Sequence, residues 1–170
     1  SDKAVSDKKL AGISRPMVQI PMTGGAIAVA YNKPGCDVQM TQSELVKVFA
    51  GVIVDWREFG CAAGRITTVV RSDGSGTTAG FTNSLSAFSP AWKRQVGRGK
   101  SVQWPARGTV AAKGNSGIAG QIATRVGTIG YLNYGYVKSN GFQQAAIQNK
   151  DGNYVRANAE TSAAGLSQIK

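Results

Sequence analysis

A run of β-branched residues that ends in a short loop of small residues constrains the fold of this chain most. Residues 66–70 are all β-branched and predict a buried strand, and small residues dominate the loop that follows at 72–76. Beyond the loop, Phe81, Leu85 and Phe88 recur at helical spacing and predict a helix with one apolar face. A strand, a tight loop and a helix in this order form a unit of an α/β fold.

The same segment places hydrogen-bond donors where a helix begins. Arg71 ends the predicted strand, and Ser75, Gly76 and Thr77 lie at the start of the predicted helix. Free backbone N–H groups and the helix dipole favour an anion there, and Arg71 adds a planar fork of donors suited to an oxyanion. Asp73 is placed to hold that fork. The alternative is an ordinary strand–loop–helix turn with Asp73 as the helix N-cap and Arg71 in solvent.

Strands and helices alternate along the rest of the chain. The pattern therefore predicts an α/β layer structure of mainly parallel strands flanked by helices, in one domain and without internal repeats. Further strands are expected at 17–20, 26–31, 101–104 and 128–132, and a hairpin at 145–148 and 154–156. Further helices are expected after the capping box Thr41–Glu44, after the cap Ser89, after the cap Asn115 (with Ile118, Ile122 and Val126) and from Ala157 onward.

The charge of the chain is strongly basic. Its 20 Lys and Arg residues against 9 Asp and Glu residues give a net charge of +11, which attracts small anions, anionic surfaces and polyanions. The basic residues are spread out, and the nearest approach to a cluster is Lys93, Arg94, Arg98 and Lys100. We therefore favour a solvated basic surface over a nucleic-acid-binding patch.

The chain contains no histidine, which removes Ser-His-Asp and Cys-His catalysis and histidine-based metal sites. Its two cysteines, Cys36 and Cys61, make a poor zinc site alone, so no metal and no cofactor is expected. They are expected to pair in an exported protein and to stay unpaired in a cytosolic one. No apolar run approaches the roughly 20 residues that span a bilayer, so we expect a soluble chain.

Several motifs in sequence order resemble periplasmic phosphate-binding proteins, the receptors of phosphate ABC transporters. The loop at 71–77 looks like the phosphate-loop motif of that family. The segments at 92–99 and 101–105, at 113–119 and at 127–131 resemble the next three family segments, and 1–10 resembles the SD…SDxxL stretch ahead of them. The likeness covers nearly the whole chain.

The resemblance implies a binding-protein lobe of type II architecture that closes on phosphate. Arg71 would be the charged donor, Asp73 its salt-bridge partner, and Ser75, Gly76 and Thr77 would donate from backbone and hydroxyl groups. Asp2 would accept a proton from the phosphate, which selects against sulfate but not against arsenate. The family's exported location, together with the even cysteine count, predicts a Cys36–Cys61 disulfide worth on the order of 3 kcal/mol.

The match begins at about the first hinge crossing of the family, because the Gly-rich loops of its first lobe have no counterpart here. We expect residues 1–20 to be a remnant of the first lobe with the hinge approach, and residues 21–170 to be the second lobe. The implied protein is a monomeric, exported receptor whose partners are inorganic phosphate and a membrane permease, with no nucleic acid.

Two other functions are alternatives to that of a receptor. A basic polyanion- or nucleic-acid-binding module is the first, and it would lose affinity steeply with salt. A phosphoryl-transfer enzyme is the second. A Walker-type loop needs a Lys before its Ser or Thr, and Gly76-Thr77 lacks one; a Ser nucleophile would lack a histidine base. We therefore expect no catalytic residues.

Overall fold

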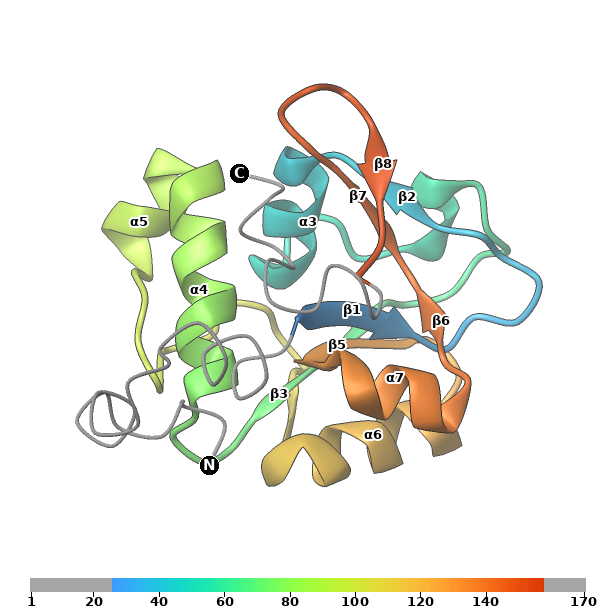
Figure 1. The fold of residues 1–170 in the computed structure, drawn as a ribbon. Helices are drawn as coiled ribbons and strands as arrows, with labels where there is room; N and C mark the ends of the chain where they lie inside the picture. The colour runs from blue at the N-terminus through green and yellow to red at the C-terminus, as the bar shows by residue number, and fades with distance from the viewer. Residues whose placement is uncertain (1–25, 158–170) are drawn as a thin grey trace, which may run out of the picture.

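A five-stranded mixed sheet with helices on both faces forms the centre of the molecule (Figure 1). The structure is a computed structural model and describes residues 26–157. In spatial order the strands are β4 (Val110–Ala112), β3 (Thr67–Arg71), β5 (Thr128–Asn133), β1 (Ile27–Tyr31) and β6 (Gln143–Gln144). Because β1 alone runs against its two neighbours, four of these five strands share one direction. The expected α/β fold with a mainly parallel sheet is confirmed.

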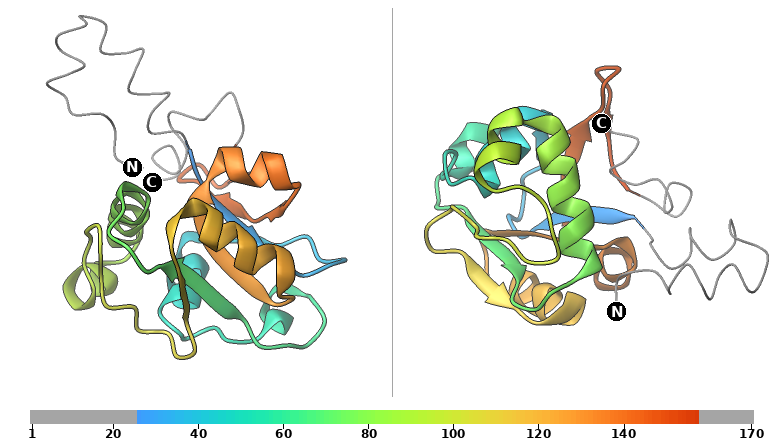
Figure 2. Two further views of the ribbon diagram at one scale, coloured as in Figure 1. Left: turned by 90° about the horizontal axis from the view of Figure 1, so that it is seen from below. Right: turned by 90° about the vertical axis from the view of Figure 1, so that its left-hand side faces the viewer.

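Helices cover the two faces of this sheet unequally (Figure 2). The helical segments are α3 (Gln42–Phe49), the 3-10 turn η1 (Trp56–Phe59), α4 (Gly76–Phe88), α5 (Pro90–Gln95), α6 (Gly114–Thr124) and α7 (Tyr134–Asn140). Helix α4 packs on one face with α3 and α5 beside it, and α6 and α7 pack on the other. A small second sheet of β2 (Gln39–Met40), β7 (Ala146–Gln148) and β8 (Tyr154–Val155) lies against α3. No helix among residues 26–157 is long and apolar enough to cross a membrane.

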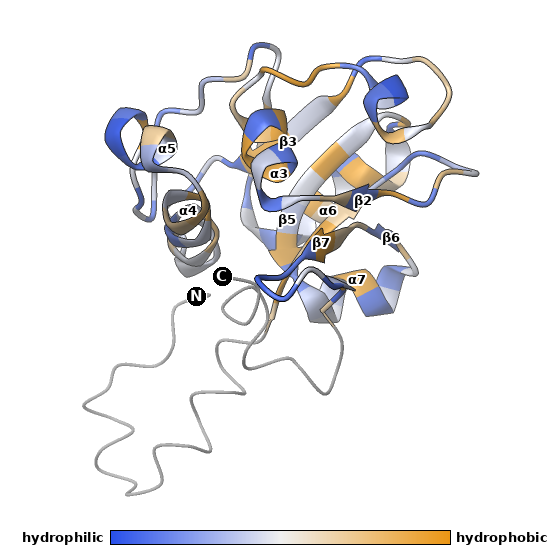
Figure 3. Ribbon diagram, turned by 90° about the horizontal axis from the view of Figure 1, so that it is seen from above, coloured by the Kyte–Doolittle hydropathy of each residue, from blue (hydrophilic) through white to orange (hydrophobic). Residues whose placement is uncertain are grey.

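The sheet separates two hydrophobic cores because successive residues of a strand point to opposite faces. On β5, Tyr131 enters the core beneath α3 and α4, and Leu132 enters the core beneath α6. The first core is aromatic: the Phe81 ring stacks on Tyr131 at 4.5 Å between centroids, and Phe49 meets Phe81 edge-on at 4.9 Å. In Figure 3 hydrophobic residues lie on parts of the central strands, and hydrophilic residues lie mainly on the outer turns.

Most predicted elements are present at or within two residues of their expected bounds. The capping box is complete, since Thr41 Oγ1 accepts from the Glu44 N–H at 3.1 Å and Glu44 Oε1 accepts from the Thr41 N–H at 2.9 Å. Ser89 caps α5 as expected, through the Trp92 N–H. The predicted hairpin is formed by β7 and β8.

Three local predictions are wrong. The cap of α6 is at Lys113, because the buried Asn115 side chain turns inward and accepts from the Asn133 N–H at 3.0 Å. Val126 lies beyond the helix and is 67% exposed. Residues 101–104 form no strand, since β4 takes the edge beside β3.

One α-helix was not predicted, and three expectations fall outside the described residues. Helix α7 was not predicted, because its apolar periodicity spans only seven residues. The expected strand at 17–20, the helical tail beyond 157 and residue Asp2 lie outside the described residues.

Candidate functional site

An arginine–aspartate pair marks the carboxyl end of β3. Arg71 Nε and Nη2 donate to the two carboxylate oxygens of Asp73, both at 2.8 Å, in a bidentate arrangement. The Arg71 side chain is only 6% exposed and that of Asp73 is 32% exposed. A guanidinium has five N–H donors, so these two bonds are compatible with an anion as an additional partner. Because the Arg71 side chain is buried against Asp73, the alternative that places Arg71 in solvent is wrong.

The loop after this pair delivers the backbone into the first turn of α4. Ser75, and not Asp73, is the N-cap: its Oγ accepts from the Thr78 N–H at 2.9 Å and its hydroxyl contacts Thr78 Oγ1 at 3.0 Å. The N–H groups of Gly76 and Thr77 belong to the first turn, where a helix offers them no internal acceptor. Gly76 and Thr77 therefore present the donors and the positive end of the helix dipole beside Arg71.

Tyr131 joins the two halves of the site. Its hydroxyl lies 2.7 Å from Thr78 Oγ1 in α4 and accepts from the Arg71 N–H in β3 at 3.1 Å. The ring packs against both Phe81 and Trp104, with a centroid distance of 5.6 Å to Trp104. Burial raises the pKa of the Tyr131 hydroxyl above its usual value, so it remains protonated at neutral pH and can both donate and accept.

Asp73 also connects the site to a second helix. Its Oδ1 accepts from the Gly114 N–H at 3.2 Å, in the first turn of α6. The hydrogen bonds from Arg71, supported by Gly114, hold the pKa of the Asp73 carboxyl far below its usual range. Asp73 is therefore ionised throughout the physiological range, and Arg71 keeps a fixed partner.

Five of the six residues expected at the site follow one another from the end of β3 to the first turn of α4: Arg71, Asp73, Ser75, Gly76 and Thr77. The sixth, Asp2, lies outside the described residues. The Ser75 hydroxyl caps α4 through Thr78, and its expected role as a donor to an anion stays a prediction. Sequence reasoning did not assign Tyr131 and Gly114 to the site, although both lie in segments, 127–131 and 113–119, that resemble the family.

The predicted disulfide is confirmed, with Cys36 bonded to Cys61 and a Cα–Cα distance of 5.5 Å. It connects the loop after β1 to the segment after η1. Tyr31 supports the same loop, because its hydroxyl donates to the Cys36 carbonyl at 2.7 Å and accepts from the Val38 N–H at 2.9 Å. Residues 26–157 contain no cluster of Cys, Asp and Glu able to hold a metal ion.

Comparison with known proteins agrees with this architecture. Residues 1–169 match a family described as a PBP superfamily domain. The chain belongs to the PBP superfamily. Within it, the chain is 36% identical over 182 residues to the phosphate-binding protein PstS of Xylella fastidiosa, covering 98% of the chain and 48% of that protein. It is 37% identical over 167 residues to the PstS of Haemophilus influenzae, covering 91% and 49%.

A solved structure shows the same fold. A high-affinity periplasmic phosphate-binding protein (PfluDING) bound with phosphate superposes with a TM-score of 0.69 at 24% identity, over 95% of this chain and 50% of that one. This PBP-superfamily chain thus spans about half the length of the curated relatives that it matches.

Proposed function

We propose that this PBP-superfamily chain is the anion-binding lobe of a receptor that captures inorganic phosphate for uptake by an ABC transporter. The observation that carries the proposal is the Arg71–Asp73 pair held beside the first turn of α4. The names of the PstS relatives support phosphate as the ligand. Residues 21–170 would form the second lobe, and residues 1–20 would approach it from the first.

The chemistry of the loop favours an oxyanion that is held by dipoles. The charges of Arg71 and Asp73 cancel to a large extent within their bidentate pair, so the pair adds directional donors with little net charge. The Gly76 and Thr77 N–H groups add donors at a helix N-terminus. A tetrahedral anion with several acceptor oxygens fits these convergent donors.

Asp2 is the proposed specificity residue. A carboxylate repels a fully deprotonated oxyanion but accepts a hydrogen bond from one that still carries a proton. At neutral pH phosphate and arsenate carry a proton and sulfate does not. Asp2 would therefore select phosphate against sulfate.

The proposed setting is that of an exported, monomeric receptor that delivers phosphate to a membrane permease. The Cys36–Cys61 disulfide supports an oxidising compartment. The relatives are named as binding proteins and not as enzymes, and we propose no catalytic role for this chain.

The test is a titration of the ¹⁵N-labelled 170-residue chain with inorganic phosphate, followed by NMR. We expect weak, saturable shifts at the amides of Gly76 and Thr77. Arg71→Lys keeps the charge but loses the planar fork, and should weaken binding about tenfold, or about 1.4 kcal/mol. Arg125→Lys, at the exposed C-terminal end of α6, is the matched control and should bind as the parent does. Equal affinity of the Arg71→Lys variant and the parent would refute the assignment.

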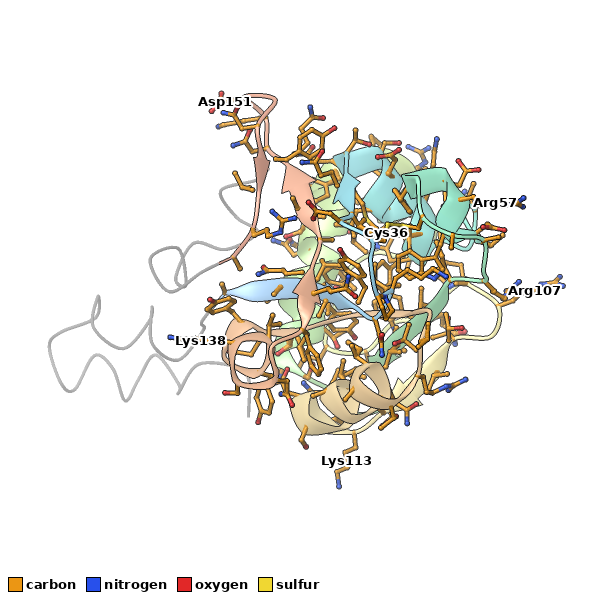
Figure 4. All side chains as sticks on the ribbon, turned by 90° about the vertical axis from the view of Figure 1, so that its right-hand side faces the viewer. Cys36, Arg57, Arg107, Lys113, Lys138 and Asp151 are labelled. Atoms are coloured by element: carbon orange, nitrogen blue, oxygen red, sulfur yellow. A yellow bond between two sulfur atoms is a disulfide. The ribbon has the colours of Figure 1, made fainter. Side chains whose placement is uncertain are left out.

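A polyanion-binding module remains the second candidate because of the net charge of +11. Basic side chains such as Arg57, Arg107, Lys113 and Lys138 project from different edges of the molecule (Figure 4), which favours a dispersed basic surface. Salt distinguishes the two functions. The affinity of a polyanion for such a surface should fall steeply with salt, whereas phosphate bound at the loop should respond little.

A further inference from the structure

A basic residue that the sequence does not assign to the site lies against the loop between β3 and α4. The Ser75 N–H donates to the Lys100 carbonyl at 3.0 Å. A Cβ placed on Gly74 would lie 3.8 Å from the Lys100 Cβ. Lys100 is therefore in direct contact with the two residues that precede the first turn of α4.

The segment that carries Lys100 is fixed to α4. The chain that leaves α5 runs back beside α4 toward the loop (Figure 1). The Gly99 N–H donates to Thr82 Oγ1 at 3.0 Å, and Arg98 Nη1 donates to Asn83 Oδ1 at 2.7 Å. Because both acceptors belong to α4, the packing of this segment sets the place of Lys100 beside the loop.

Lys100 brings a positive charge that its surroundings do not offset. The charges of Arg71 and Asp73 largely cancel within their bidentate pair. Lys100 is exposed, and within residues 26–157 it has no ion-pair partner. From residue 74 to residue 150 the chain contains no Asp or Glu. Lys113, the N-cap residue of α6, extends away from the molecule (Figure 4). Among the described residues, Lys100 is thus the cation placed to give the loop a net positive charge.

The charge of Lys100 stays close to the loop in every side-chain conformation. The ammonium group ends a four-carbon stem, so all rotamers keep it within about 10 Å of Gly74. The screening length of salt is about 10 Å at 0.1 M and about 3 Å at 1 M. An anion at the loop should therefore respond to this charge at low salt and much less at high salt.

From these observations we infer that Lys100 is a further phosphate-attracting residue, which supplies the net positive charge that the Arg71–Asp73 pair lacks. The inference rests on the phosphate function proposed above and adds one residue to that site. Because Lys100 acts through its charge on a flexible, exposed stem, an arginine at this position should serve equally well. The attraction should be larger for doubly charged phosphate than for a singly charged anion.

The experiment titrates the ¹⁵N-labelled 170-residue chain with inorganic phosphate at pH 8 and follows the amides of Gly76 and Thr77, at constant ionic strengths of 50 mM and 0.5 M. At 50 mM, Lys100→Gln should weaken binding about threefold and Lys100→Glu about tenfold, whereas Lys100→Arg should bind as the parent does. At 0.5 M the loss in Lys100→Gln should fall below about 1.5-fold. This salt response is far smaller than that of a bound polyanion.

Lys93→Gln is the matched control. It removes the same charge from an exposed residue of α5, beyond the C-terminal end of α4 and about 20 Å along the helix from the loop, so binding should not change. The melting temperatures of all these variants should equal that of the parent, because both lysines are exposed.

The outcomes separate this inference from the proposed function. Equal affinity of Lys100→Gln and the parent at 50 mM would overturn the role of Lys100 and leave the phosphate site standing. An equal loss in Lys93→Gln would overturn it too, since the attraction would then belong to the whole basic surface. A loss that persists at 0.5 M, or that Lys100→Arg shares, would show that Lys100 does not act through its charge. No saturable shift at Gly76 and Thr77 in the parent would refute the proposed function, and the inference with it.

Discussion

Removal of the Tyr131 hydroxyl is the strongest test of how the fold positions the loop between β3 and α4. Tyr131→Phe removes one oxygen atom and keeps the ring, which is buried and stacked on Phe81 and Trp104. No cavity larger than a hydroxyl results. The substitution therefore isolates the two contacts of the hydroxyl, with Thr78 Oγ1 at 2.7 Å and with the Arg71 N–H at 3.1 Å.

The size of the effect follows from these two contacts. Each hydrogen bond is worth about 1 kcal/mol net, so the loss of both should cost about 2 kcal/mol. The cost should not be larger, because Thr78 Oγ1 keeps its contact with Ser75 Oγ. For a domain of this size, 1 kcal/mol corresponds to about 2–4 °C, so the melting temperature should fall by about 4–8 °C. Phosphate binding should weaken as well, because β3 and the first turn of α4 lose their connection.

Urea and thermal unfolding of the parent and the Tyr131→Phe variant measure the loss. Tyr136→Phe on α7, where Tyr136 is 40% exposed, is the matched control and should change the unfolding free energy by less than about 0.5 kcal/mol. If Tyr131→Phe also changes it by less than that, the hydroxyl does not connect the two elements and the reasoning is wrong. A loss of stability with unchanged phosphate affinity would refute only the effect on the site.

Three further predictions concern Asp73, the disulfide and Gly130. Folding lowers the pKa of the Asp73 carboxyl, so the ionised carboxylate stabilises the fold above its unfolded pKa near 4, and this contribution is lost as the pH falls. The Asp73→Asn variant should therefore lose less stability between pH 5 and pH 3 than the parent does, as measured by acid unfolding. Reducing the Cys36–Cys61 disulfide, which closes a separation of 25 residues, should cost about 3–4 kcal/mol in urea unfolding, and alkylation before reduction should leave both cysteines unlabelled in the mass spectrum. Gly130→Ala should destabilise the chain by about 1–3 kcal/mol in thermal unfolding, because the new Cβ would lie 2.9 Å from a backbone oxygen of the neighbouring strand. An unchanged melting temperature would show that the strands can separate to admit the methyl group.

Much of the local structure was predictable because its signals are local. The capping box at Thr41 and Glu44, the strand that ends at Arg71 and the hairpin after β7 each depend on residues within a few positions of one another. Asn115 shows the limit of such reasoning. Asn is a favoured N-cap, but here its side chain satisfies a distant backbone N–H of β5, a contact that sequence spacing does not reveal.

The α/β class, the loop between β3 and α4 and the donors of that loop could be read from the sequence, because β-branched runs, helical periodicity and caps act over a few residues. How those donors are held depends on tertiary contacts. The parallel pairing of β3 with β5 brings Tyr131 to Arg71, 60 residues away, and the start of α6 brings Gly114 to Asp73, 41 residues away. Contacts of this kind arise from the packing of whole elements around a shared core, which no local segment of the chain encodes.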